Sequence, residues 1–305
     1  MRTFILGTDW WTDCDDAVAL RLLSRFIKDD KIQLLGIGIN GCMEYSVASL
    51  KGFLHAEGIE NVPIGIDLDA TDFGGKPPYQ KRLALDHAPN ITNSDATDAV
   101  RLYRRILADL EEKTEIIEIG YLQVIAAVLK SQPDDISDKS GVDLICEKVS
   151  KIWVMAGKWD KDGEMENNFC RNARSRIAGK EFCELCPVPV TFLGWEIGYG
   201  VITGGELNEN DHLYRALCDH GSQKGRHSWD PMLVLMALIG DENAAGYDTI
   251  TGTASVNADT GANHFSKDPK GMHRFVIKKY ANDYYEKQIN QLIYYKESLD
   301  KRQKT

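Results

Sequence analysis

Short apolar runs alternate with longer amphipathic segments along the first two thirds of the chain. Apolar residues recur at helical spacing in residues 15–27, 44–58, 96–113 and 121–131. The apolar runs are typical of strands and lie at residues 3–7, 32–40, 62–66, 115–120, 151–157 and 189–195. Strands this short and this continuously apolar are buried on both faces of a sheet. The pattern therefore predicts an α/β fold with a doubly wound, mainly parallel, Rossmann-like central sheet.

Two segments interrupt the alternation. Residues 67–93 are rich in Gly, Pro and Asp and have little periodicity, which predicts a long loop near the mouth of a site. Residues 278–305 have apolar and aromatic positions at helical spacing followed by charged ones, which predicts a terminal helix packed on the sheet with a frayed tail. Because no shift in composition marks a boundary, we expect a single domain over residues 1–305.

The chain is acidic, with 46 Asp and Glu against 36 Lys and Arg and a formal net charge of −10. This balance disfavours nucleic acid as a partner and suits cations or neutral polar ligands. No apolar run is long enough to cross a membrane, and acidic residues begin too early for a signal peptide. We therefore expect a cytoplasmic protein. The CxxC pair Cys183 and Cys186 lacks the further ligands that zinc needs, so the cysteines are interpreted as reduced thiols.

Four carboxylates follow the first predicted strand: Asp9, Asp13, Asp15 and Asp16. Ligands bind open α/β sheets at this edge. Carboxylates this close repel one another unless a cation neutralises them, and an oxygen-only ligand set favours Ca²⁺ or Mg²⁺. A helix N-cap at Asp15 would explain one carboxylate only, and Trp10 and Trp11 are poor choices for a solvated acidic loop. The cluster therefore predicts a divalent metal site.

The run T-D-x-x-x-D-x-D-D-A-x-A-L over residues 8–20 resembles the signature of the inosine-uridine preferring nucleoside hydrolase family. The chain has the variant with an extra residue inside the Asp cluster. Further short motifs follow in the family's order, at residues 38–40 (GIN), 119–127 (IGYLQVIAA), 163–169 (GEMENNF) and 228–231 (SWDP). The similarity spans roughly residues 3–235. It implies the nucleoside hydrolase fold, a small-molecule nucleoside as substrate and a homodimer or homotetramer.

The resemblance also implies a role for particular residues. The Ca²⁺ ligands of the family correspond to Asp9, Asp16, the carbonyl of Ile119 and Asp230, and Asp9 is also the expected general base. The ribose contacts correspond to Asp15, Asn40, Glu166 and Asn168, with Asn167 beside them as a supporting residue. Acceptor carboxylates and amphoteric amides together suit a sugar, because its hydroxyls both donate and accept hydrogen bonds.

The sequence departs from the family pattern in the first turn and before the last metal ligand. Gly7 replaces a second Asp, Trp10 and Trp11 replace a Pro-Gly turn, and the extra Asp13 is an alternative to Asp15 for the ribose. Trp229 stands where many members have a His that protonates the leaving base. Two alternatives remain for the base: His227 reaches it, or an aromatic side chain stacks on it, the candidates being Trp10, Trp11, Trp195 and Trp229.

The sequence as a whole predicts Ca²⁺-dependent hydrolysis of the N-glycosidic bond of a ribonucleoside to free base and ribose. The alternative is a catalytically impaired nucleoside- or sugar-binding protein that keeps the metal site, which Trp229 leaves open. A haloacid-dehalogenase type phosphatase fits less well, because its D-x-D-x-[TV] motif does not occur in the segment that follows the first strand.

Overall fold

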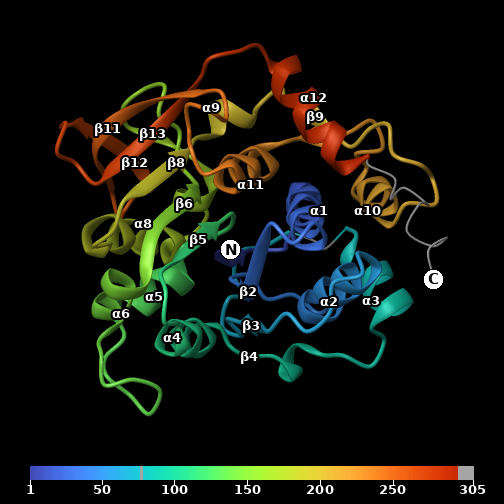
Figure 1. Cartoon of the computed structure of the whole chain (residues 1–305), viewed down its shortest axis with the longest axis horizontal. Coiled ribbons are helices and arrows are strands. Elements are labelled where there is room, and N and C mark those ends of the chain that lie inside the picture. Colours follow the sequence, from blue (N-terminus) through green and yellow to red (C-terminus); the bar gives the residue numbers. More distant parts are fainter. Residues whose placement is uncertain (76–77, 295–305) are drawn as a thin grey trace.

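The computed structural model describes residues 1–75 and 78–294. Over these residues eleven strands form one sheet in the order β4-β3-β2-β1-β5-β6-β8-β13-β11-β12-β7 (Figure 1). Its parallel part contains β1 (Arg2–Thr8), β2 (Ile32–Ile39), β3 (Ile64–Ile66), β4 (Thr97–Asp98), β5 (Thr114–Glu118), β6 (Val149–Met155), β8 (Val190–Leu193) and β13 (His273–Lys278). The predicted α/β class and mainly parallel sheet are confirmed.

Three antiparallel strands extend the sheet beyond β13: β11 (Tyr247–Val256), β12 (Ala262–Lys267) and β7 (Glu164–Met165). The apolar pattern does not predict them, because much of β11 and β12 is exposed and carries polar side chains. A separate pair of short strands, β9 (Ile202–Thr203) and β10 (Arg226–His227), lies outside the main sheet. Part of this strand pair reaches the pocket described below.

Helices cover both faces of the sheet (Figure 1). One face carries α1 (Asp15–Lys28), α2 (Ser46–Ala56), α10 (His212–His220), α11 (Trp229–Ile239) and α12 (Asn282–Ile293), and the other carries α4 (Ala99–Asp109), α5 (Gln123–Lys130), α6 (Gly141–Lys148) and α8 (Ala173–Leu185). Alternation along β1 directs Phe4 and Leu6 into the first core and Ile5 into the second. The sheet is therefore doubly wound, as predicted. None of the described helices is long and apolar enough to span a bilayer.

The loop predicted over residues 67–93 is partly wrong, because α3 (Gln80–His87) lies within it and packs on α2. Only Gln80, Leu83 and Ala84 of this helix are buried, so its sequence has no long apolar stripe. The predicted terminal helix is α12, which packs on α1 and α11. The expected frayed tail lies outside the described residues. The organisation of residues 1–305 as a single domain stays a prediction.

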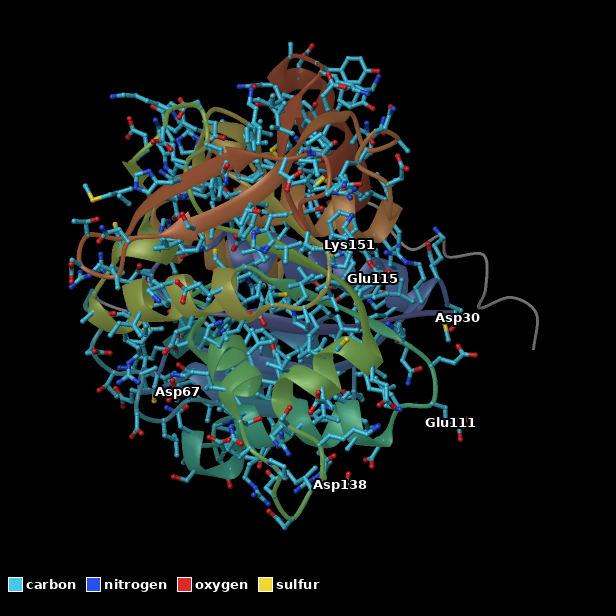
Figure 2. The ribbon with its side chains drawn as sticks, turned by 90° about the vertical axis from the view of Figure 1, so that its left-hand side faces the viewer. Asp30, Asp67, Glu111, Glu115, Asp138 and Lys151 are labelled. Carbon is cyan, nitrogen blue, oxygen red and sulfur yellow. The ribbon has the colours of Figure 1, made fainter. Side chains whose placement is uncertain are left out.

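The strand order places a crevice beside β1. The chain winds from β1 to β2 on one side and β5 lies on the other, so the connections diverge at the carboxyl end of β1. Figure 2 shows that the carboxyl ends and the amino ends of the parallel strands lie well apart. Asp67 follows β3 at the carboxyl edge, whereas Glu115 and Lys151 lie at the amino ends of β5 and β6. Asp9, Asn40 and Ile119 directly follow β1, β2 and β5 and so meet at the carboxyl edge.

A buried ion network fixes α1 against its neighbours. Arg21 of α1 donates from Nε to Glu57, which caps α2, and from Nη2 to Asp211, which caps α10, at 2.6 Å. Its Nη1 also donates to the carbonyl of Ile293 in α12 at 3.1 Å. Arg21 and Glu57 are each only 2% exposed. The network holds three neighbouring elements around the helix whose first turn carries Asp15 and Asp16.

We expect Arg21→Met to lower the free energy of unfolding by about 3 kcal/mol, because it leaves buried carboxylates without their cation. Urea denaturation followed by circular dichroism measures the change. Arg101→Met is the matched control, since Arg101 makes a similar bidentate pair with Asp135 on the exposed surface. Equal losses of stability in the two variants would contradict a special role for the buried network.

Candidate active site

A pocket of about 270 Å³ opens at the carboxyl edge beside β1 and β5. It is lined by Asp9, Asp13, Asp15, Asp16, Ile119, Met155, Glu166, Asn167, Asn168, Trp195, Arg226, Trp229 and Asp230. The structure thus brings together the predicted site residues except Asn40, His227 and the two stacking candidates Trp10 and Trp11, which are absent from the described lining. It adds Met155 and Arg226, which the sequence analysis did not single out.

Three carboxylates converge at the acidic end of the pocket. Asp15 and Asp16 lie in the first turn of α1, and Asp230 lies in the first turn of α11, which packs against α1. One oxygen from each carboxylate lies within 4.8 Å of the other two. Helix N-termini favour negative charge, and the backbone N–H of Asp230 donates to Oδ2 of Asp15 at 3.1 Å. Thr8 Oγ1 donates to Oδ1 of Asp16 and fixes the second carboxylate.

Burial dominates the electrostatics of this trio. It raises the pKa of Asp15, Asp16 and Asp230 well above the usual value for Asp, and repulsion among the carboxylates raises each pKa further. Among the described Lys and Arg side chains, none forms an ion pair with these three carboxylates. Buried acceptors that form no ion pair with the described basic side chains fit a hard divalent cation, because such a cation prefers oxygen ligands. The residues present therefore suit a metal site.

Asp9 occupies the tight turn that leaves β1. Its Oδ1 accepts the N–H of Trp11 at 3.1 Å, and burial followed by repulsion from Asp15 raises its pKa to about 7. Gly120 allows the close approach, because a Cβ there would lie 2.3 Å from the Asp9 nitrogen and 2.6 Å from Asn40 Oδ1. Asp9 lines the same pocket as the trio.

The two tryptophans of this turn serve the core. Trp10 has a positive φ of 45°, and its buried indole donates from Nε1 to Ser49 Oγ at 2.8 Å. Trp11 packs edge-on against Phe73, with ring centroids 6.2 Å apart. Both are almost fully buried and neither is among the described lining residues, so neither offers a face for a base. They make this turn a packed one.

Asn40 lies behind the pocket. It is fully buried, its Oδ1 accepts the N–H of Tyr121 at 3.0 Å, and its backbone carbonyl accepts Nε2 of Gln123. These contacts tie the end of β2 to the segment that follows β5 and hold Ile119 at the pocket wall. Asn40 Nδ2 has no hydrogen-bond partner among the described residues.

Glu166 begins the short helix α7 (Asn167–Cys170) on the opposite wall. Its Oε1 accepts the N–H of Asn168 and its Oε2 accepts the N–H of Gly157, each at 2.9 Å. Burial raises the pKa of Glu166 to about 7. Asn168 donates from Nδ2 to the carbonyl of Met155 at 2.8 Å, and Asn167 donates to Tyr121 Oη at 3.4 Å. The Glu-x-Asn segment is thus rigidly oriented toward the carboxylates.

Glu118 explains why residue 7 is glycine. Gly7 and Glu118 are register partners on β1 and β5, and a Cβ at Gly7 would lie 1.8 Å from Glu118 Oε2. The Glu118 carboxyl is fully buried, accepts from Tyr103 Oη at 3.2 Å and has a pKa raised by burial to about 8. The Glu118 carboxyl of β5 therefore occupies the space that a side chain at position 7 would need.

The other end of the pocket is aromatic. Trp195 begins α9 (Trp195–Gly198), and Trp229 donates from Nε1 to its carbonyl at 2.7 Å. The rings of Trp195 and Trp229 lie 6.3 Å apart. His227 instead stacks on Tyr199 and accepts the N–H of Gly200 on Nδ1 at 2.9 Å. His227 thus contacts these neighbours, and the preceding residue, Arg226, lines the pocket.

Comparison with known proteins gives the fold. No protein-family model and no curated protein matches the chain. Among solved structures it is similar to the inosine-uridine preferring nucleoside hydrolase of Bacillus anthracis, with 16% identity, a TM-score of 0.65, and coverage of 96% of this chain and 99% of that one.

Two further solved structures are similar to this chain over nearly its whole length. The purine-preferring ribonucleoside hydrolase of Gardnerella vaginalis has 14% identity and a TM-score of 0.69, over 96% of this chain and 98% of that one. The type III effector protein XopQ, complexed with adenosine diphosphate ribose, has 16% identity and a TM-score of 0.65, over 96% and 93%. The resemblance seen in the sequence is confirmed in three dimensions: this chain has the nucleoside hydrolase fold.

Proposed function

We propose that the protein hydrolyses the N-glycosidic bond of a ribonucleoside to free base and ribose in a Ca²⁺-dependent reaction. The observation that supports this proposal is the buried trio of Asp15, Asp16 and Asp230, which faces a ligand-sized pocket without a basic partner among the described residues. The fold is that of nucleoside hydrolases, and the pocket lies where such a sheet binds ligands.

In this proposal Ca²⁺ is held by Asp9, Asp16, the carbonyl of Ile119 and Asp230. When bound, the ion fixes the ribose hydroxyls and lowers the pKa of a water molecule. The ribose is held by Asp15, Glu166 and Asn168, with Asn167 supporting that segment, whereas a contact from Asn40, which is outside the described lining, stays a prediction. One oxygen of Asp15 lies within 4.8 Å of an oxygen of Asp16 and of Asp230, so a sugar bound by Asp15 would lie next to the metal ligands.

Asp9 is the proposed general base. In this role the Asp9 carboxylate accepts a proton from water, and the N–H of Trp11 holds its Oδ1 in place. As the glycosidic bond breaks, the sugar gains positive charge, which the surrounding carboxylates stabilise. Trp195 and Trp229 border the space left for the base.

A binding protein is the second candidate function. Trp229 stands where many family members have a His acid, and the only polar hydrogen of its side chain, on Nε1, is donated to the Trp195 carbonyl. Trp229 therefore has no proton to give to a leaving base. A protein of this kind would bind Ca²⁺ and nucleoside without turnover.

The cytoplasmic location and the homodimer or homotetramer stay predictions.

The first test measures reducing-sugar release from a panel of purine and pyrimidine ribonucleosides with Ca²⁺ and with a chelator. We expect chelator-sensitive release, and a fall in kcat of about 10²–10⁴-fold in Asp9→Asn, because the base is lost. Asp135→Asn is the matched control, since Asp135 is exposed and outside the described pocket lining. Tight Ca²⁺ and nucleoside binding without any sugar release would favour the binding protein.

The second test concerns the pH dependence of Ca²⁺ binding by calorimetry. Because burial raises the pKa of Asp9 to about 7 and those of the trio above the usual value, the metal-free site holds protons that Ca²⁺ must displace. We therefore expect affinity to rise from pH 5.5 to pH 8 (roughly the span around the pKa of Asp9) with proton release on binding. Asp230→Ala should weaken binding sharply. Unchanged affinity in that variant would refute the metal assignment.

A further inference from the structure

A charged pair stands at the aromatic end of the pocket. Arg226 donates from Nε to Asp13 Oδ1 at 2.8 Å and from Nη2 to Asp13 Oδ2 at 2.6 Å. Their side chains are 28% and 33% exposed, so both are half-buried at the pocket wall. Among the described residues that line the pocket, Arg226 is the one basic side chain.

Each partner of the pair has a further contact that holds it in place. Asp13 Oδ1 also accepts the N–H of Cys14, directly before α1, and the guanidinium of Arg226 lies over the Trp229 ring at 5.5 Å. Asp13 binds two of the five N–H donors of this guanidinium, and the described residues accept none of the others. Free donors of a permanent cation therefore remain beside the aromatic wall.

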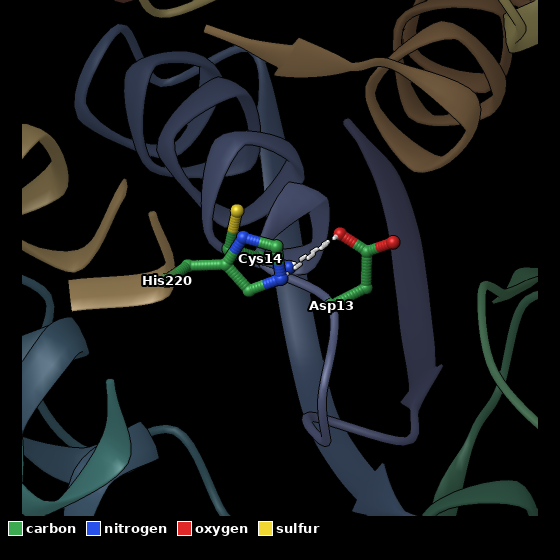
Figure 3. Close-up of side chains that lie close together, drawn as sticks. All are labelled: Asp13, Cys14 and His220. Atoms are coloured by element: carbon green, nitrogen blue, oxygen red, sulfur yellow. Dashed lines mark hydrogen bonds and ion pairs between the residues drawn. The ribbon is translucent and has the colours of Figure 1, made fainter. Parts of the chain in front are cut away.

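Asp13 also takes part in a second cluster, with Cys14 and His220 (Figure 3). His220 Nε2 lies 4.0 Å from Asp13 Oδ1. A second metal ion is not favoured here, because both Asp13 oxygens already accept hydrogen bonds from the guanidinium. The guanidinium is thus the nearer partner of Asp13.

We propose that Arg226 is a catalytic residue that donates hydrogen bonds to the leaving base, and that Asp13 is its positioning residue. This inference rests on the proposed function. The carboxylates hold the sugar at one end of the pocket, so the base lies toward Trp195 and Trp229. The Arg226 guanidinium borders that same end, and it therefore meets the edge of the base rather than the sugar.

The chemistry balances without an acid at position 229. The oxygen of water forms a bond to C1′ of the ribose while the bond from C1′ to the base nitrogen breaks, and the electron pair of that bond stays on the base. One water proton passes to Asp9. The base leaves as an anion whose charge the guanidinium stabilises through N–H donors to a ring nitrogen or carbonyl oxygen, and solvent then protonates it. Arg226 stays charged throughout, because its pKa is far above neutral pH.

The test compares two leaving groups in the full-length protein with Ca²⁺: the best nucleoside substrate and 4-nitrophenyl riboside. Nitrophenolate is a stable anion that needs no help to leave. We expect Arg226→Met to lower kcat/KM for the nucleoside by about 10²–10³-fold, the usual effect of removing one such donor, and for the nitrophenyl riboside by about threefold or less. Arg226→Lys should fall between Arg226→Met and wild type, because it keeps the charge without the planar fork.

Asp13→Asn tests the positioning role, with a smaller loss of about tenfold expected on the nucleoside and none on the nitrophenyl riboside. If Arg226→Met fails to fold, Asp13→Asn serves as the test variant in its place. Arg101→Met, which breaks an exposed Arg–Asp pair outside the described pocket lining, should leave both substrates unchanged. Equal losses on both substrates in the Arg226 and Asp13 variants would overturn the inference. A wild-type protein inactive on both substrates would instead overturn the proposed function.

Discussion

Three carboxylates are buried together without a basic partner among the described residues, and the architecture of the site follows from the need to hold them there. Bringing like charges out of water is strongly unfavourable unless protons or a cation neutralise them. The chain places Asp15, Asp16 and Asp230 in the first turns of two helices packed side by side, where backbone N–H groups favour negative charge. Because no described basic side chain pairs with these carboxylates, a bound cation would stabilise the arrangement.

Contacts in the strands and helices around the site also help to hold the carboxylates together. Gly120 lets the segment after β5 approach Asp9 and Asn40, and Gly7 leaves room for the Glu118 carboxyl from the neighbouring strand. The buried Arg21 network holds α1 against α2, α10 and α12. Each of these contacts limits how far the carboxylates can relax apart. The fold therefore keeps the acidic end of the pocket organised through close backbone approaches together with buried side-chain contacts.

The two ends of the pocket differ in chemistry. The acidic end offers oxygen acceptors for a metal ion and sugar hydroxyls, whereas the other end offers the indoles of Trp195 and Trp229 and the guanidinium of Arg226. A histidine acid at position 229 would give a proton to the base. A tethered guanidinium supplies charge and hydrogen bonds but keeps its protons, so it suits a base that can leave as a stabilised anion.

The sequence alone determined the acidic cluster and the parallel strands β1, β2, β3, β5, β6 and β8, because closely spaced Asp residues and short apolar runs are local signals; it did not predict β4 and β13. It also singled out Asp9, Glu166 and Asp230, which all line one pocket. Only the tertiary structure decided the rest. Arg226 and Asp13 pair across 213 positions, and Glu118 fills the space at Gly7 from another strand. The α3 helix and the antiparallel strands bury few apolar side chains, so no local pattern predicted them. Contacts between distant segments leave no local period, and therefore only folding reveals them.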